Sequence, residues 1–210
     1  MHSWTPLRQK AAQHSNEAQW RALVLGGARS GKSAFAERLL ADDDEVLYAA
    51  TAPHYDADDE WAERIARHRQ RRPASWGTVE LGQSPAGLAD LLIRADRTVL
   101  VDSLTLWLTA AMDAVHAWDD DAWREGGARQ ALDGLTSGLV DAFENSARSV
   151  VLVSDEVGFG VVPESAGTRR FRDELGRLNQ AVAAVADEVS LVVAGIAVRL
   201  KPGPGALGSG

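Results

Sequence analysis

The sequence feature that most constrains the fold is Arg21 to Leu40, RALVLGGARSGKSAFAERLL, in which Gly26 to Ser33 has the pattern G-x-x-x-x-G-K-S. Four apolar residues, Ala22 to Leu25, precede the glycines and predict a buried strand, and the residues after Ser33 predict a helix. A phosphate-binding loop needs this order, because its N–H groups turn between a strand and the N-terminus of a helix. The segment therefore predicts a phosphate site. The alternative is a glycine-rich turn that only caps a helix.

The residue types inside this loop suit a nucleotide. Gly26, Gly27 and Gly31 let the backbone bend so that successive N–H groups point at one anion. Lys32 is expected to reach the β- and γ-phosphates, and the Ser33 hydroxyl is expected to hold Mg²⁺. A nucleotide with bound Mg²⁺ is therefore the expected ligand.

A magnesium ion at such a loop usually needs a carboxylate at the end of a neighbouring strand. Asp102 ends the run TVLVD, whereas Asp155 and Glu156 follow the run VVLVS. We favour Asp102 as the metal ligand, because Ser103 to Thr105 supply further hydroxyls near the same edge. The alternative is that either acid is only a turn residue or a helix cap.

Short apolar runs alternate with helix-length segments along the chain. Four runs are typical of strands buried on both faces of a parallel sheet: Val46 to Thr51, Thr98 to Asp102, Ser149 to Ser154 and Val189 to Ala194. After the last run, Gly195 predicts either a tight hairpin to an antiparallel edge strand or a bulge within one strand.

Two segments have the three- and four-residue periodicity of amphipathic helices. The first contains Leu132, Leu135, Leu139 and Phe143, and the second runs from Thr168 to Ala186. Together with the strands, they predict an α/β chain. The expected architecture is a three-layer P-loop nucleotide-binding fold with a mostly parallel central sheet and an antiparallel C-terminal edge strand.

The length of 210 residues suits one globular domain. We expect a flexible N-terminal arm at residues 1–20, a single nucleotide-binding domain at 21–201 and a disordered tail at 202–210, which is rich in glycine and proline. The net charge of −8 disfavours broad nucleic-acid binding, and the absence of cysteine excludes disulfides and thiolate metal sites. With neither a signal peptide nor an apolar run of about 20 residues, the sequence predicts a cytoplasmic protein without a membrane span.

The segment Asp56 to Pro73, DADDEWAERIARHRQRRP, is the second informative stretch. Its acids come first and its bases last, which complements the macrodipole of a helix. On such a helix, Arg64 and Arg71 lie four residues before and three residues after His68. Neighbouring guanidiniums favour the neutral imidazole, which can act as a nucleophile, and they can hold phosphate oxygens. The alternative is a basic solvated helix with a histidine packed on its edge.

Several motifs, including the glycine-rich loop, occur in a characteristic order along the chain. They are GGARSGKS at Gly26 to Ser33, LYAAT at Leu47 to Thr51, Arg64-Ile65 with His68-Arg69, Arg72-Pro73 followed by Trp76, Thr78 and Glu80, VLVDSLT at Val99 to Thr105, EVGFGVVPE at Glu156 to Glu164, and FRDELGRLNQ with ADEVSLVVAGI between Phe171 and Ile196. This set resembles the bifunctional adenosylcobinamide kinase / adenosylcobinamide-phosphate guanylyltransferase family of cobalamin biosynthesis, over about residues 21 to 201.

The resemblance implies two reactions at one nucleotide site. The first phosphorylates the terminal hydroxyl of the aminopropanol arm of adenosylcobinamide with ATP or GTP. The second transfers GMP from GTP to that phosphate through a guanylyl-histidine, which maps to His68, so the implied catalytic residues are His68, Lys32 and Asp102. The nucleotide-binding residues are expected to be Gly26, Gly27, Ala28, Arg29, Ser30, Gly31, Lys32, Ser33, Thr51, Arg69, Gln70, Arg71, Arg72, Glu80 and Asp102. The resemblance leaves open whether Glu80 or Asp102 pairs with the guanine edge or with the metal; Ser33 and Asp102 are the Mg²⁺ ligands favoured by the loop motif and the strand end.

The chain departs from the family pattern at two places. Asp155 stands where members usually have asparagine, which adds negative charge near the expected site. Arg67-His68 stands where some members have two histidines, which leaves His68 as the candidate in that segment.

The family resemblance also implies a homotrimer with the histidine helix near the subunit interface. Trp61, Trp107 and Trp118 are candidate contact residues, with burial in the core as the alternative. Two other functions fit the loop motif alone: another small-molecule P-loop kinase in which His68 is structural, and a nucleotide-dependent switch without catalysis.

Overall fold

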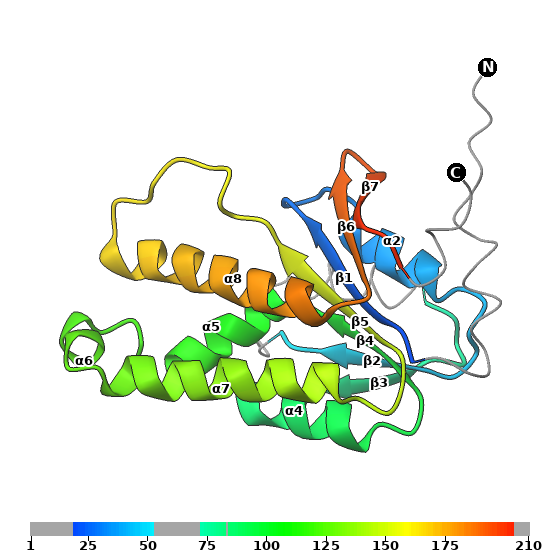
Figure 1. The fold of residues 1–210 in the computed structure, drawn as a ribbon, viewed down its shortest axis with the longest axis horizontal. Coiled ribbons are helices and arrows are strands. Elements are labelled where there is room, and N and C mark those ends of the chain that lie inside the picture. The colour runs from blue at the N-terminus through cyan, green and yellow to red at the C-terminus, as the bar shows by residue number, and fades with distance from the viewer. Residues whose placement is uncertain (1–18, 53–71, 83, 204–210) are drawn as a thin grey trace.

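The computed structural model describes residues 19–52, 72–82 and 84–203. These residues build one seven-stranded sheet in the order β3-β2-β4-β5-β1-β6-β7 (Figure 1). The strands are β1 (Arg21–Gly26), β2 (Val46–Ala50), β3 (Gly77–Glu80), β4 (Thr98–Asp102), β5 (Val150–Asp155), β6 (Glu188–Val193) and β7 (Ile196–Lys201). The paired strands are parallel except for β6 and β7, which are antiparallel, so the predicted α/β P-loop architecture is confirmed.

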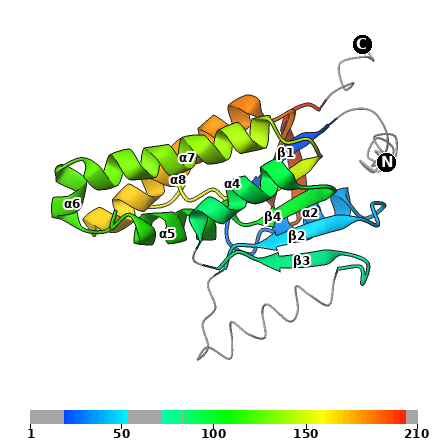
Figure 2. The same ribbon diagram turned by 90° about the horizontal axis from the view of Figure 1, so that it is seen from below.

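Helices cover both faces of the sheet. One face carries α4 (Pro85–Arg94), α5 (Leu104–Ala114), α7 (Gly127–Glu144) and α8 (Ala166–Val185), with the short α6 (Asp120–Arg124) at their far end (Figure 2). On the other face, the described part of the chain contributes α2 (Lys32–Leu39). In the described part of the chain the three layers are therefore of unequal thickness, because four helices pack on one face of the sheet and one packs on the other.

The alternation of side chains along the strands decides which layer each residue joins. In β5, Val150 and Leu152 pack into the core under the four helices, whereas Val151 and Val153 pack into the core under α2. Because successive residues of a strand point to opposite faces, Asp155 at the end of β5 lies on the α2 face. The same alternation places Asp102 of β4 on that face.

The chain turns tightly between β6 and β7. Val193 pairs with Ile196, so Ala194 and Gly195 form a two-residue hairpin loop. Their φ angles of 50° and 79° are both positive, as a type I′ turn requires. The predicted hairpin and antiparallel edge strand are therefore confirmed, and the alternative of a bulge at Gly195 is wrong.

The predicted helices also form where the periodicity placed them. Leu132, Leu139 and Phe143 are fully buried in α7, and α8 begins two residues before the predicted Thr168. No sequence pattern predicted β3, α4, α5 or α6. Of the helix predicted at 56–73, residues 56–71 lie outside the described residues.

The tryptophans proposed as contact residues differ in how deeply they are buried. Trp107 is buried in the core and its indole N–H donates to the carbonyl of Pro85, so its assignment as a contact residue is wrong. Trp118 is partly exposed and stacks on Phe171 with ring centroids 6.0 Å apart. Trp61 lies outside the described residues. No helix in the described part of the chain is long and apolar enough to cross a bilayer.

Candidate functional site

The loop between β1 and α2 is shaped by two glycines and one arginine. A Cβ on Gly26 would lie 2.7 Å from the carbonyl oxygen of Val192 in β6, so only glycine fits there. Gly31 has φ +93° and packs against Gly195, since a Cβ would lie 3.3 Å from the Cα of that residue. Arg29 also takes a positive φ, of 56°. These contacts hold the loop against the β6–β7 turn, where the N–H of Gly195 donates to the carbonyl of Ser30.

Gly27 differs from the other two glycines of the motif. A Cβ there would meet no atom within 4 Å, and its φ lies outside the left-handed region. Gly27, Ala28 and Arg29 form the exposed tip of the loop, whereas Ser30 is buried. The motif predicted the same backbone role for all three glycines, but the fold requires glycine only at Gly26 and Gly31 of the three.

The N-terminus of α2 is open toward this loop. The helix begins at Lys32 with Gly31 as its N-cap, and among the described residues no side-chain cap accepts from its first N–H groups. Those groups have no partner inside the helix and carry a partial positive charge. Ser33 occupies the second helical position, within the same turn. The loop and helix end are thus arranged to receive an anion such as a phosphate.

Lys32 is buried and makes two polar contacts. Its Nζ lies 2.5 Å from Oδ1 of Asp155 and donates to the carbonyl oxygen of Gly27 at 3.3 Å. The β1–β5 pairing places Gly26 directly opposite Asp155, which brings the carboxylate to the level of the loop. From its position after a strand, Asp155 was a candidate metal ligand, and its pairing with Lys32 was not predicted.

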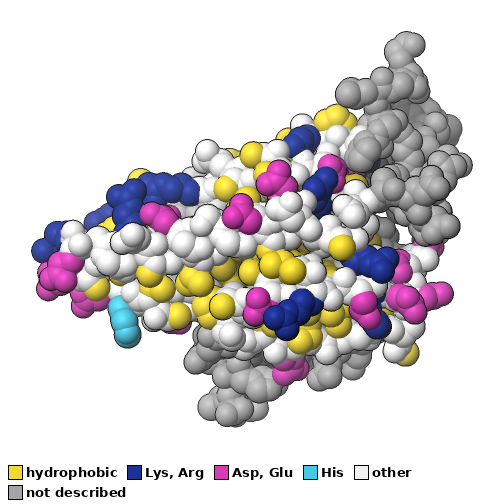
Figure 3. Space-filling model, turned by 60° about the horizontal axis from the view of Figure 1, so that its bottom comes forward, with side chains coloured by type: hydrophobic (Ala, Val, Ile, Leu, Met, Phe, Trp, Pro, Cys, Tyr) yellow, Lys and Arg dark blue, Asp and Glu magenta, His cyan; other side chains and the backbone are white. Residues whose placement is uncertain are grey.

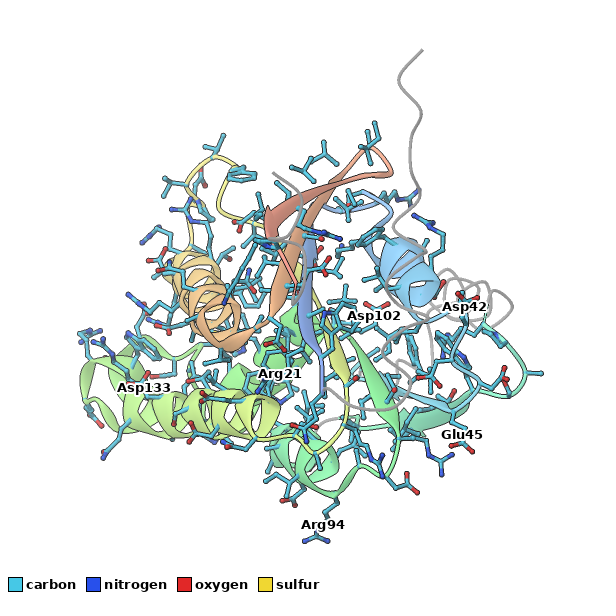
Figure 4. The ribbon with its side chains drawn as sticks, turned by 45° about the vertical axis from the view of Figure 1, so that its right-hand side comes forward. Arg21, Asp42, Glu45, Arg94, Asp102 and Asp133 are labelled. Carbon is cyan, nitrogen blue, oxygen red and sulfur yellow. The ribbon has the colours of Figure 1, made fainter. Side chains whose placement is uncertain are left out.

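Asp102 lies on the α2 side of the sheet, two strands away from β1 (Figure 4). The hydroxyl of Tyr48 in β2 donates to Oδ2 of Asp102 at 2.9 Å. Burial, followed by the charge of Asp102, raises the pKa of Tyr48 above the usual range, so the hydroxyl stays protonated and keeps donating. Tyr48, within the LYAAT motif, is a site residue that sequence reasoning missed.

Arg72 contacts the aromatic ring of Tyr48, whereas Asp102 contacts its hydroxyl. Its guanidinium carbon is 3.3 Å from the centre of the Tyr48 ring, a cation–π contact. Arg72 follows His68 by four positions in the sequence. Tyr48 therefore links the carboxylate of Asp102 to Arg72, the first described residue of the segment predicted as a helix at 56–73.

Two further predicted residues lie at the same edge of the sheet. Glu80 ends β3 and Asp102 ends β4, and both pair with Ala50 of the strand between them, so their Cα atoms are about 10 Å apart. Thr51 is buried, and its hydroxyl both donates to the carbonyl of Ser103 and accepts from the Ser103 N–H. Thr51 thus holds the turn after β4, and nucleotide contact by Thr51 or Glu80 stays a prediction.

The hydroxyl expected from Thr105 is also present at this edge. Its Oγ1 accepts from the N–H of Asp155 at 2.9 Å, which ties α5 to the end of β5. The neighbouring Glu156 caps its own loop, since its Oε1 accepts from the N–H of Gly158. Of the three acids considered as metal ligands, Glu156 is therefore engaged away from Lys32.

The predicted nucleophile, His68, and the predicted nucleotide-binding residues Arg69, Gln70 and Arg71 lie outside the described residues. Within the described ranges, His116 is the only histidine. It is exposed, and Figure 3 shows a histidine side chain at the end of the molecule that carries α6. The 11 residues of α5 separate His116 from Asp102, a rise of about 16 Å. His116 is therefore not part of the site.

The acids and histidines that the structure describes form no group of three or more that could hold a metal ion. A magnesium ion on a nucleotide needs fewer protein ligands, because phosphates and water complete its shell. The hydroxyl of Ser33 and the carboxylate of Asp102 are hard oxygen donors, the type that Mg²⁺ prefers. The donor chemistry therefore fits the predicted ion.

The comparison with known proteins identifies the family. Residues 22–200 match the family described as cobinamide kinase / cobinamide phosphate guanyltransferase. The chain belongs to this family. Membership confirms the enzyme class that the sequence predicted, a kinase and guanylyltransferase, and the match runs through both the loop at Gly26 to Ser33 and the segment with His68.

Individual relatives agree with this family assignment. The chain is 45% identical over 180 residues to the bifunctional adenosylcobalamin biosynthesis protein CobU of Escherichia coli (strain K12), with 85% of this chain and 98% of that protein covered. It is 44% identical over 188 residues to the bifunctional adenosylcobalamin biosynthesis protein CobP of Pseudomonas aeruginosa, with 88% and 99% covered. Relatives in this family thus align with almost the whole of their length.

Solved structures outside the family show the same fold. A prototypical ATPase from the type III secretion system of pathogenic bacteria superposes with a TM-score of 0.52 at 12% identity, covering 82% of this chain and 50% of that chain. The assembled ATPase EscN from the enteropathogenic E. coli type III secretion system gives a TM-score of 0.52 at 12% identity, covering 84% and 43%. These likenesses concern the P-loop fold alone.

Proposed function

We propose that this chain phosphorylates adenosylcobinamide with ATP or GTP and then transfers GMP from GTP to the new phosphate, giving adenosylcobinamide-GDP in cobalamin biosynthesis. One observation carries the proposal: a single family match covers residues 22–200, including both the phosphate loop and the segment with His68. The relatives named above are bifunctional adenosylcobalamin biosynthesis proteins.

The kinase step uses the loop and the open end of α2. The substrate hydroxyl oxygen attacks the γ-phosphorus, the bond from that phosphorus to the β–γ bridging oxygen breaks, and the nucleoside diphosphate leaves. The hydroxyl proton passes to solvent. Lys32 and the first N–H groups of α2 hold the negative charge of the terminal phosphates, which grows on the leaving diphosphate.

The guanylyl step uses His68 as the nucleophile. An imidazole nitrogen attacks the α-phosphorus of GTP and pyrophosphate leaves, so a phosphorus–nitrogen bond replaces a phosphorus–oxygen bond. A phosphate oxygen of adenosylcobinamide phosphate then attacks the same phosphorus and releases His68. The covalent intermediate divides one displacement between anions into two steps, and Arg69 and Arg71 would spread the charge.

Mg²⁺ is the proposed metal, held by Ser33 and Asp102. When bound, it neutralises part of the charge of the phosphates. In this arrangement Tyr48 orients Asp102, because its hydroxyl donates to Oδ2 of that carboxylate. Nucleotide contacts by Arg72, Glu80 and Thr51 are part of the same proposal.

The proposed assembly is a cytoplasmic homotrimer. In support, the hairpin of β6 and β7 exposes four apolar side chains, Val193, Ile196, Val198 and Leu200, each more than half exposed. Phe159 and Val161 in the β5–α8 loop are 82% and 93% exposed. Exposed apolar side chains of this kind favour contact with another protein chain. Light scattering after size exclusion tests the trimer, and a monomer at micromolar concentration would contradict it.

The decisive experiment labels the protein with GTP carrying radioactive α-phosphorus. We expect acid-labile, base-stable label on the wild type, as a phosphoramidate requires, and none on His68→Ala. His116→Ala is the matched control and should keep the label, because His116 is exposed and distant from the loop. Label retained by His68→Ala, or a folded wild type without label, would contradict the covalent role of His68.

A further inference from the structure

The closest ion pair in the phosphate loop joins Lys32 to Asp155. The Nζ and Oδ1 atoms lie 2.5 Å apart, and the two side chains are only 10% and 23% exposed. A charge pair this short and this shielded from water is weakly screened. In this structure the ammonium that should bind phosphate therefore already has an anionic partner.

The carboxylate of Asp155 is held in place by its backbone. Its N–H donates to Oγ1 of Thr105, and its carbonyl accepts from Nδ2 of Asn179 at 3.1 Å. The pairing of β5 with β1 sets Asp155 opposite Gly26. Because strand pairing and neighbouring side chains fix this backbone, removing the Asp155 charge leaves those anchors intact.

We infer that Asp155 acts as a built-in competitor for the phosphates of the nucleotide. Its carboxylate pairs with the Lys32 ammonium, and the terminal phosphates must either displace Asp155 from Lys32 or share Lys32 with it when they bind. A carboxylate near Lys32 repels a triphosphate, and a divalent cation on the phosphates reduces that repulsion. Asp155 therefore sets triphosphate affinity and makes it depend on the cation. This inference rests on the proposed function in one respect, that Lys32 binds the terminal phosphates.

Asp102 does not provide the same competition. The hydroxyl of Tyr48 donates to its Oδ2, and β5 separates β4 from the loop-bearing β1. Asp102 pairs with Val153 of β5, two residues before the level of Gly26 and Asp155. The two strand-end acids thus have separate roles, with Asp155 acting on Lys32.

The test compares the wild type with Asp155→Asn, which keeps the shape of the side chain and removes its charge. Calorimetric titrations with GTP and with inorganic tripolyphosphate are run in EDTA and in Mg²⁺. In EDTA we expect Asp155→Asn to bind both ligands about tenfold more tightly than the wild type or better, and in Mg²⁺ the gain should fall to about threefold or less. Glu156→Gln removes one charge from the adjacent residue, whose side chain contacts Gly158 instead, and should match the wild type.

Each outcome decides the inference. Equal or weaker binding by Asp155→Asn overturns it, as does an equal gain in Glu156→Gln, which would show a general effect of net charge. Asp155→Ser removes the same charge if the asparagine variant does not fold. If wild type and variant bind GTP equally, the proposed function stands and only this inference falls; if neither binds GTP with Mg²⁺, both fall.

Discussion

Replacing Gly26 by alanine should damage the fold at the start of the phosphate loop. A Cβ at this position would lie 2.4 Å from Oγ of Ser30 and 2.7 Å from the carbonyl oxygen of Val192. The Ser30 side chain can rotate away, since its buried hydroxyl has no hydrogen-bond partner among the described residues. The carbonyl of Val192 cannot, because Gly26 and Val192 are paired in the β1–β6 ladder.

The expected cost follows from this backbone clash. Overpacking of a rigid site costs about 1–3 kcal/mol, and the upper part of that range applies because strands must separate. Replacing glycine by alanine returns about 0.4–1 kcal/mol by restricting the unfolded chain. We therefore expect Gly26→Ala to lower the free energy of unfolding by about 1–2.5 kcal/mol, measured by urea denaturation at fixed protein concentration.

Gly27→Ala is the matched control within the same motif. Its Cβ would meet no atom within 4 Å and its φ is outside the left-handed region. The substitution should therefore affect stability only by restricting the conformations of the unfolded chain. The variant should be unchanged or more stable by up to about 1 kcal/mol. Equal destabilisation of the two variants, or a Gly26→Ala protein as stable as the wild type, would refute the reasoning.

Three further changes have defined outcomes. Lys32→Met should weaken GTP binding by about ten- to hundredfold, since a charge-assisted hydrogen bond contributes about 1.5–3 kcal/mol; unchanged calorimetric affinity would exclude its phosphate role. Tyr48→Phe should leave the tyrosinate absorbance at about pH 10 unchanged, because burial raises the pKa of Tyr48 above that of a free tyrosine. A smaller absorbance would contradict the buried hydroxyl. The variant should also lower kinase turnover, because it removes the hydrogen bond that orients Asp102. Burial also raises the pKa of Glu174, so its contribution to stability is present at low pH and lost as pH rises through the folded pKa. Glu174→Gln should therefore melt higher than the wild type near pH 8, with the difference closing toward pH 4, and a constant difference would contradict this assignment.

Most of the architecture could be predicted from local pattern. Runs such as Thr98 to Asp102 became β4 with identical bounds, because a strand buried on both faces has a continuous apolar signature. The Gly195 turn was also predictable, since its conformation needs positive φ. The four-residue strand β3 was not, because GTVE is too short and too exposed to show a period.

The candidate site was only partly predictable. The sequence proposed the loop, Lys32 and both strand-end acids, but it ranked Asp102 over Asp155 from the residues that follow them. Tyr48 had no functional signal, because an aromatic residue in a buried strand is ordinary core. Its hydroxyl acquires a role only when β2 and β4 become neighbours and Asp102 comes within 2.9 Å.

The sequence by itself determined the chemistry available to this protein: a strand, a glycine loop and a helix carrying Lys32 and Ser33, with acids at the ends of two later strands. Those features are local, and spacing along the chain is sufficient to define them. The tertiary structure alone decided which acid faces the lysine. Strand order places β5 beside β1 and puts Asp155 opposite Gly26, and the order of strands in a sheet depends on packing between distant segments, which no local pattern encodes.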